Sequence, residues 1–189
     1  MIRTFRILSA LLDYPDRELF EALPEVPGFL EQDGVLSADQ VALVEKFVRE
    51  MGKRQTLATL QADYSALFDS GRRESLYLFD YVYGEKRERG EAMVDLLATY
   101  EASGAKLREG ELPDYLPVLL EFAAEQPDTA TALKLLAELG GVLRVMERQF
   151  EDQKHPYAPV ITVLRELSGA ERKLSPSTVV PIKPAGDRQ

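Results

Sequence analysis

Apolar residues recur with the 3.6-residue period of an α-helix along nearly the whole chain, and this pattern restricts the fold more than any other sequence feature. The stripes include Phe5, Leu8 and Leu12; Val41, Val44, Val48 and Met51; Leu57, Leu60, Tyr64, Leu67 and Phe68; and Val160, Ile161, Leu164 and Leu167. The composition of Leu76 to Tyr83 favours a strand. A lone strand would have no pairing partner in a helical chain, so this segment is predicted to be an extended or short helical connector. The sequence therefore predicts an all-α, single-domain helical bundle.

Capping residues, prolines and glycines predict where the first helices begin and end. Ser37 and Gln40 have the spacing of a capping box, in which each side chain accepts from the backbone N–H of the other residue. Pro24, Pro27 and Gly28 predict a loop between the second and third helical segments.

Similar reasoning applies to the second half of the chain. A helix is predicted to start at Leu112-Pro113-Asp114, which would place Asp114 in the first turn, beside the positive end of the helix dipole. Pro117 fits this helix only within its first turn, where a missing N–H costs nothing. Residues 129–153 are predicted to be one long helical stretch with a possible kink at Gly140-Gly141.

The net charge of −9 is unevenly distributed along the 189 residues. Residues 171–189 hold four basic and two acidic side chains, so this stretch carries +2 and the rest of the chain −11. This end contains three prolines and no helical period, so we expect a helical domain over 1–169 and a flexible, proline-containing tail over 170–189. An acidic body argues against nucleic acid as a partner and favours a cationic one.

The N-terminus does not have the pattern of an export signal. The apolar run after Arg6 is about six residues long, shorter than the apolar core of a signal peptide. No stretch of the sequence approaches the ~20 apolar residues of a membrane span. We therefore expect a cytoplasmic protein that is not integral to a membrane.

The composition argues against most kinds of catalytic or metal site. There is no cysteine and a single histidine, His155, so thiolate metal sites, thiol catalysis and multi-histidine sites are excluded. No glycine-rich phosphate loop is present. Asp152 and His155 have the spacing of half a carboxylate-bridged metal site, but the second half is missing, so a surface histidine at a helix end is the preferred interpretation. We expect no bound cofactor, no metal and no catalytic residues.

Two clusters are less easily explained as solvated surface. The first runs from Tyr81 to Met93 and contains Gly90 early in a helix, where glycine costs about 1 kcal/mol relative to alanine. Either a close approach by a neighbouring element or ligand, or simple tolerance, would explain this glycine. The second cluster runs from Glu111 to Phe122, and its two prolines fix the path by which the chain enters a helix.

These clusters resemble motifs of the respiratory nitrate reductase assembly chaperones, within the wider group of system-specific chaperones for twin-arginine-type molybdoenzymes. Residues 81–93 resemble H-V-H-G-(D/E)-x-R-D-R-G-x-A-M, and residues 112–122 resemble L-P-D-(H/Y)-L-P-x-x-L-E-F. Residues 11–16 and 64–69 match two earlier blocks of the family, and Pro156-Tyr157 matches a weaker one. Tyr81 and Tyr83 replace the usual histidines, so a role that depends on imidazole is not expected here.

The resemblance implies a non-catalytic helical chaperone of the molybdoenzyme type. Such chaperones bind the N-terminal, cationic segment of the apo catalytic subunit of nitrate reductase and keep that subunit competent for molybdenum cofactor insertion. The implied partners are this catalytic subunit and the molybdenum cofactor delivery proteins.

We expect the peptide-binding groove beside the two motifs. The expected binding residues are Tyr83, Gly84, Arg87, Arg89, Gly90, Pro113, Asp114, Tyr115, Pro117 and Glu121. Tyr83, Asp114, Tyr115 and Glu121 would present a polar and aromatic surface, and the glycines and prolines would shape the backbone. The two arginines would either pair with Asp114 or Glu121 or contact an acidic surface of the client.

Three other interpretations remain open from the sequence. The chain could serve a different twin-arginine-type molybdoenzyme, since sibling subfamilies share the fold. It could be a generic helical peptide-binding adaptor with an unrelated partner. It could also be an enzyme, although the motif inventory disfavours this.

Overall fold

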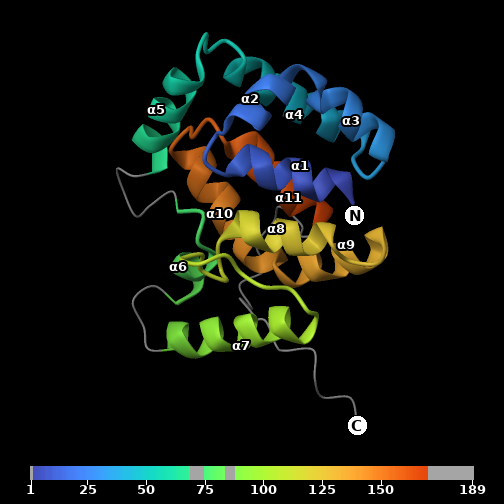
Figure 1. Cartoon of the computed structure of the whole chain (residues 1–189), viewed down its shortest axis with the longest axis vertical. Helices are drawn as coiled ribbons and strands as arrows, with labels where there is room; N and C mark the ends of the chain where they lie inside the picture. Colours follow the sequence, from blue (N-terminus) through green and yellow to red (C-terminus); the bar gives the residue numbers. More distant parts are fainter. Residues whose placement is uncertain (1, 69–74, 84–87, 170–189) are drawn as a thin grey trace.

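The chain folds as a layered assembly of helices, and the computed structural model describes residues 2–68, 75–83 and 88–169 (Figure 1). The described helices are α1 (Arg3–Leu12), α2 (Arg17–Ala22), the 3₁₀ turn η1 (Leu23–Glu25), α3 (Val26–Asp33), α4 (Ala38–Met51), α5 (Leu57–Phe68), α6 (Leu78–Val82), α7 (Glu88–Ala102), α8 (Leu116–Ala124), α9 (Thr129–Glu138), α10 (Gly140–Asp152) and α11 (Ala158–Leu167). No extended strand occurs among these residues, which confirms the all-α prediction. The expected tail over 170–189 lies outside the described residues.

Helix α1 lies at the centre of the fold and packs against α8 and α3. Its apolar stripe, including Phe5, Leu8 and Leu12, is completely buried. Burial of each such side chain contributes about 1.5–3 kcal/mol. The backbone N–H and hydroxyl of Thr4 both donate to Asp33 Oδ2, at 2.9 and 2.7 Å, and tie the start of α1 to the end of α3.

A second group of contacts joins α4, α10 and α11, since α11 packs against both of the other helices. The predicted capping box at the start of α4 is confirmed. Ser37 Oγ accepts from the Gln40 N–H, and Gln40 Oε1 accepts from the Ser37 N–H. Among the described helices, none has the length and apolar composition that a membrane span requires.

The loop predicted around residues 24–28 is wrong, because the structure places these residues in η1 and α3. Both prolines lie in the first turn of their helix, where the missing N–H has no intrahelical acceptor to lose. The kink predicted at Gly140-Gly141 is confirmed as a break, since α9 ends at Glu138 and α10 starts at Gly140.

The segment from Leu76 to Tyr83 is a short connector, as predicted. The expectation that it has no pairing partner is wrong. Tyr77 does have a pairing partner, because it forms an isolated antiparallel bridge with Tyr115. The Leu78 N–H donates to the Asp114 carbonyl, and the Leu116 N–H donates to the Leu76 carbonyl, both at 2.9 Å. The short helix α6 follows immediately.

This bridge also corrects the predicted start of the following helix. Helix α8 begins at Leu116 rather than near Leu112, because residues 112–115 form a turn in which the Tyr115 N–H donates to the Leu112 carbonyl, and Tyr115 itself is extended and pairs with Tyr77. Pro117 lies in the first turn, as predicted, whereas Asp114 lies before the helix and does not interact with its dipole.

His155 is buried, so its interpretation as a surface histidine is wrong. Its ring lies among Phe68, Phe150 and Tyr157, with centroids 5.1, 4.4 and 5.7 Å away. Burial lowers the pKa of His155 from 6.5 to about 4. The imidazole is therefore neutral near pH 7 and acts as part of an aromatic core.

Candidate functional site: a tyrosine patch beside an apolar groove

Four sequence blocks that are distant in the chain meet where α1 ends and α8 begins. Asp13 and Tyr14 follow α1, Tyr64 comes from α5, Tyr77 from the connector, and Tyr115 precedes α8. The Tyr115 hydroxyl donates to Asp13 Oδ1 at 3.0 Å, and the Tyr64 hydroxyl donates to the Leu12 carbonyl at 2.9 Å. The two hydroxyl oxygens lie 3.2 Å apart. We call Asp13, Tyr14, Tyr64, Tyr77 and Tyr115 the tyrosine patch.

The rings of the patch also pack against one another. Tyr14 meets Tyr64 edge to face with centroids 5.6 Å apart, and Tyr77 lies 5.1 Å from Tyr115. Burial raises the pKa of Tyr115, with Tyr64 and Asp13 adding to the effect, so the phenol keeps its proton and can donate. Tyr14 and Tyr77 are 51% and 36% exposed and Asp13 is half-buried, so two aromatic side chains and part of an acidic one reach solvent.

Asp114 lies behind the patch and is completely buried. Its Oδ2 accepts from the Phe79 N–H at 3.1 Å, which satisfies one of the unpaired donors at the start of α6. Arg89 of α7 lies 3.6 Å from Oδ2 and also pairs with Asp80 at 2.6 Å. Burial raises the pKa of Asp114, and the Phe79 N–H and Arg89 oppose this shift. Asp114 therefore joins α6, α7 and the approach to α8, and the expectation that it presents a surface is wrong.

The two motif prolines are held through their carbonyl groups. The hydroxyl of buried Tyr100 donates to the Pro113 carbonyl at 2.8 Å, and Ser9 Oγ of α1 donates to the Pro117 carbonyl at 2.8 Å. These bonds fix the chain on both sides of Tyr115. The prolines therefore help to fix the backbone around Tyr115, and their part in peptide binding stays a prediction.

The remaining residues of the first motif contribute less to the patch. Arg89 pairs internally, which is one of the two alternatives considered for it. Tyr83 is half-buried and packs edge to face on Phe79 with centroids 5.3 Å apart. A Cβ placed on Gly90 would meet no described atom within 4 Å, so no neighbouring element in the described part of the chain requires this glycine. Gly84 and Arg87 lie outside the described residues.

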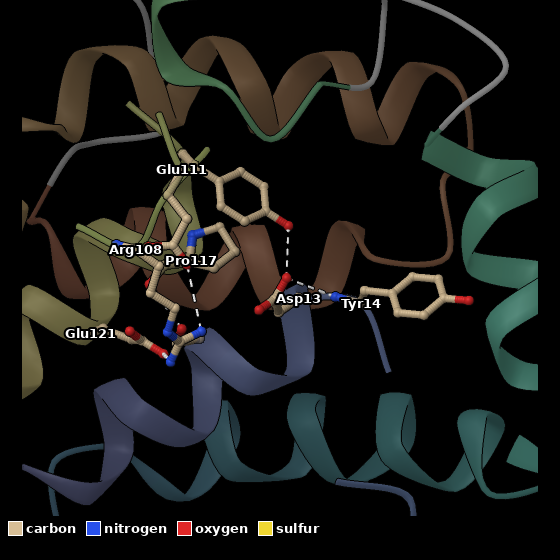
Figure 2. Close-up of polar contacts among 8 residues, drawn as sticks. Asp13, Tyr14, Arg108, Glu111, Pro117 and Glu121 are labelled. Atoms are coloured by element: carbon tan, nitrogen blue, oxygen red, sulfur yellow. Dashed lines mark hydrogen bonds and ion pairs between the residues drawn. The ribbon is translucent and has the colours of Figure 1, made fainter. Parts of the chain in front are cut away.

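Glu121 is not part of the patch. It lies with Arg108 and Glu111, at a distance from Asp13 and Tyr14 (Figure 2). Arg108 is 3.5 Å from Glu111 and 3.8 Å from Glu121. These residues border a separate hollow of about 360 Å³, whose apolar lining includes Val118 and Phe122.

An apolar groove of about 340 Å³ adjoins the tyrosine patch, because Tyr64 belongs to both. Its apolar lining comes from α4, α5 and the chain at the start of α11: Phe47, Met51, Leu60, Tyr64, Leu67, Pro156, Tyr157 and Pro159. Charged side chains border it, and Arg54 and Asp63 pair there at 2.6 Å. The groove can bind a row of apolar side chains, while the aromatic rings of the patch next to it can bind a cationic side chain.

Asp13, Tyr14 and Tyr64 were not among the predicted binding residues. They do belong to the two earlier blocks, residues 11–16 and 64–69, that carried the family resemblance. Taken separately, residues 11–16 predict the end of a helix, and residues 64–69 predict part of an amphipathic helix. Their shared location becomes apparent only when the tertiary structure brings α1, α5 and the approach to α8 together.

Comparisons with known proteins agree on one family. The family model described as the nitrate reductase delta subunit matches residues 33–163. The nitrate reductase molybdenum cofactor assembly chaperone NarJ of Escherichia coli K12 is 37% identical over 162 residues, which cover 86% of this chain and 68% of that protein. A protein of Bacillus subtilis, named as a probable chaperone of the same kind, is 34% identical over 85% of each chain.

A solved structure supports the fold. The crystal structure of a protein assigned to redox enzyme maturation, from Archaeoglobus fulgidus, has a TM-score of 0.62 and 21% identity, and the match covers 88% of this chain and 92% of that one. At this level of identity the likeness establishes a common fold. The Escherichia coli and Bacillus subtilis relatives are named as assembly chaperones and not as catalysts, as expected. From the family match, the sequence relatives and the shared fold, we conclude that this chain belongs to the nitrate reductase delta subunit family, whose members include the NarJ assembly chaperones.

Proposed function

We propose that the protein is a cytoplasmic chaperone for the apo catalytic subunit of a respiratory nitrate reductase. It binds the N-terminal segment of that subunit and keeps the subunit competent for molybdenum cofactor insertion and complex assembly. The names of the relatives support the role and the client. Molybdenum cofactor delivery proteins would be further partners during the same step.

The observation that carries the binding site is the continuity between the apolar groove and the tyrosine patch through Tyr64. A client segment that forms an amphipathic helix would place its apolar side chains in the groove, as other helices do in apolar grooves. Its Lys or Arg side chains would then lie over Tyr14 and Tyr77, next to Asp13. The apolar contacts would supply most of the affinity, and the acidic body would mainly raise the rate of encounter.

In this proposal the buried residues of the second motif do not contact the client. They support binding by holding the surface residues in place. Asp114, Pro113 and Pro117 fix the backbone on both sides of Tyr115. The Tyr115 hydroxyl then orients Asp13. In this way the buried residues of the motif would affect client binding without touching the client.

Calorimetry with a synthetic peptide of the client N-terminus tests the site. We expect Tyr14→Ala combined with Tyr77→Ala, and separately Leu67→Asp in the groove, to weaken binding at least about tenfold, or about 1.4 kcal/mol. Leu112→Ala is a matched control, since Leu112 is 44% exposed but lines neither surface. Equal affinity of the patch and groove variants and the wild type, with all variants folded by circular dichroism, would place the site elsewhere.

A pull-down from cells grown anaerobically on nitrate tests the client. Recovery of the nitrate reductase catalytic subunit is expected, and its loss when the client lacks its N-terminal segment would support the proposed mode of binding. Recovery of a different molybdoenzyme would instead favour a chaperone for that enzyme. An unrelated partner whose binding does not depend on that segment would favour a generic adaptor.

A further inference from the structure

Helix α7 has apolar side chains on its buried face and on a second, exposed face beside it. Its inner face buries Leu96 and Tyr100, which are 4% and 1% exposed. On the outer face Val94 and Leu97 are 66% and 37% exposed, three residues apart, so they are neighbours on the helix surface. Figure 1 shows α7 at one edge of the molecule, below α6 and α8. A surface helix normally presents polar residues on the face away from the core, so this second apolar face is not explained by folding.

Among the described residues, the exposed charged side chains of α7 are all acidic. Glu88, Glu91, Asp95 and Glu101 are all exposed. Within the described part of the chain, none of the four forms an ion pair. The basic residue in α7, Arg89, is turned inward to Asp80 and Asp114. The outer face of α7 is therefore apolar and acidic.

Gly90 lies on the same face, because positions 90, 94 and 97 have the i, i+4, i+7 spacing of one side of a helix. No described atom lies within 4 Å of the Cβ position of Gly90. The absence of a side chain leaves room for the backbone of a partner to approach closely at this point. This gives a physical use for a glycine that the internal packing does not require.

We propose that the outer face of α7, formed by Gly90, Val94 and Leu97 with the acidic residues around them, docks a cationic amphipathic helix of a partner protein. The partner helix carries apolar side chains at i, i+3 or i+4 and i+7, with Lys or Arg on their flanks. A second copy of this chain does not fit, because two such faces would bring like charges together. The surface is separate from the tyrosine patch and the groove, so this proposal does not depend on the proposed client site.

The experiment uses the full chain and a short helical probe peptide with leucines along one face and lysines elsewhere. Two control peptides separate the contribution of the lysine charges from that of the apolar face. One has glutamate in place of lysine, and the other has the same composition with the leucines scrambled around the helix. Every chain tested with this probe also carries Tyr14→Ala, Tyr77→Ala and Leu67→Asp, because the proposed client site would bind a peptide of the same chemistry, and wild type here means unchanged in α7. Binding is measured by fluorescence anisotropy at low and at physiological salt, because attraction between exposed charges weakens with ionic strength.

The wild type is expected to bind the leucine–lysine probe, and the combined Val94→Ser and Leu97→Ser substitutions should weaken this binding at least about tenfold. Leu112→Ser removes a similarly exposed side chain elsewhere and should have no effect. Charge reversal by Glu91→Lys with Asp95→Lys should weaken binding to a similar degree.

Three results would overturn the proposal. The probe could fail to bind the wild type, the double serine variant could bind it as tightly, or the scrambled peptide could bind equally well. The last result would mean attraction by net charge alone. Since Val94 and Leu97 are exposed, the variants should keep the wild-type thermal midpoint, which circular dichroism checks. The client peptide serves as a separate arm on chains whose tyrosine patch and groove are intact, and the α7 substitutions should leave its affinity for that site unchanged.

Discussion

At the scale of single side chains, a buried carboxylate holds the second motif in place. Asp114 was expected to contact a ligand, but it is completely buried and accepts from the Phe79 N–H. Within the described residues, its second oxygen, Oδ1, has no hydrogen-bond partner. The cost of burying this carboxylate is offset by the cap it provides to α6 and by the nearby guanidinium of Arg89.

Asp114→Ala should lower the free energy of unfolding by about 2–3 kcal/mol, because the buried Phe79 N–H would lose its acceptor. Asp114→Asn keeps an oxygen in the same place and should cost less than about 1 kcal/mol. Urea denaturation measures both. An unchanged unfolding free energy for Asp114→Ala, combined with a loss of client binding, would contradict this structural role.

His155 should make stability depend on pH. Its pKa in the folded protein is about 4, below the ordinary 6.5, so the fold favours the neutral ring. This contribution is complete above about pH 6.5 and is lost as the pH falls towards 4, up to at most about 3 kcal/mol. Urea denaturation of the wild type and of His155→Phe at pH 7 and pH 4 should show a larger loss for the wild type. A measured pKa near 6.5 for His155 by NMR would argue against this.

At the scale of elements, neighbouring helices are joined by a few specific polar contacts within an apolar interface. The interface of α10 and α11 contains an ion pair between Glu147 and Arg165 at 2.9 Å, and both side chains are almost completely buried. Arg165 and Gln40 of α4 each also bond to Glu166, so this network reaches a third helix. Such a pair specifies how helices align more than it adds net stability.

A double-mutant cycle on this pair should be strongly non-additive. Arg165→Met alone leaves Glu147 buried without its partner and should cost about 3–5 kcal/mol. Arg165→Met together with Glu147→Met should cost much less, because neither charge remains. The exposed pair Arg49 and Glu45 within α4, at 3.7 Å, is the control, and Arg49→Ala should cost less than about 1 kcal/mol. If the losses of unfolding free energy from the two single substitutions simply add up in the double variant, the two buried charges do not interact.

At the scale of the whole molecule, α1 connects the parts of the fold on which the proposed site depends. It packs on α8 and α3, and Asp13 and Tyr14 at its end belong to the tyrosine patch. The apolar groove lies between α4, α5 and the start of α11. The binding surface therefore requires residues from almost the full length of the helical part, from 13 to 159, to be folded together.

Truncation after Gly169 should leave the free energy of unfolding within about 0.5 kcal/mol of the full chain, because the apolar face of α11 is already buried against α4 and α10. Client peptide affinity should also be unchanged, since neither the patch nor the groove includes residues beyond 169. Urea denaturation and calorimetry on the truncated and full chains provide the comparison. Lower stability or affinity after truncation would give residues 170–189 a role in the domain.

The sequence by itself determined the helical class and most of the helices, because the apolar period and the caps are local properties of the chain. It also identified the family, through motifs that are contiguous in sequence. It could not show that Tyr77 pairs with Tyr115, that Asp114 caps a helix 35 residues away, or that Tyr64 joins a patch to a groove. These relations depend on long-range packing around α1, so only the tertiary structure decided which motif residues are buried supports and which lie at the surface.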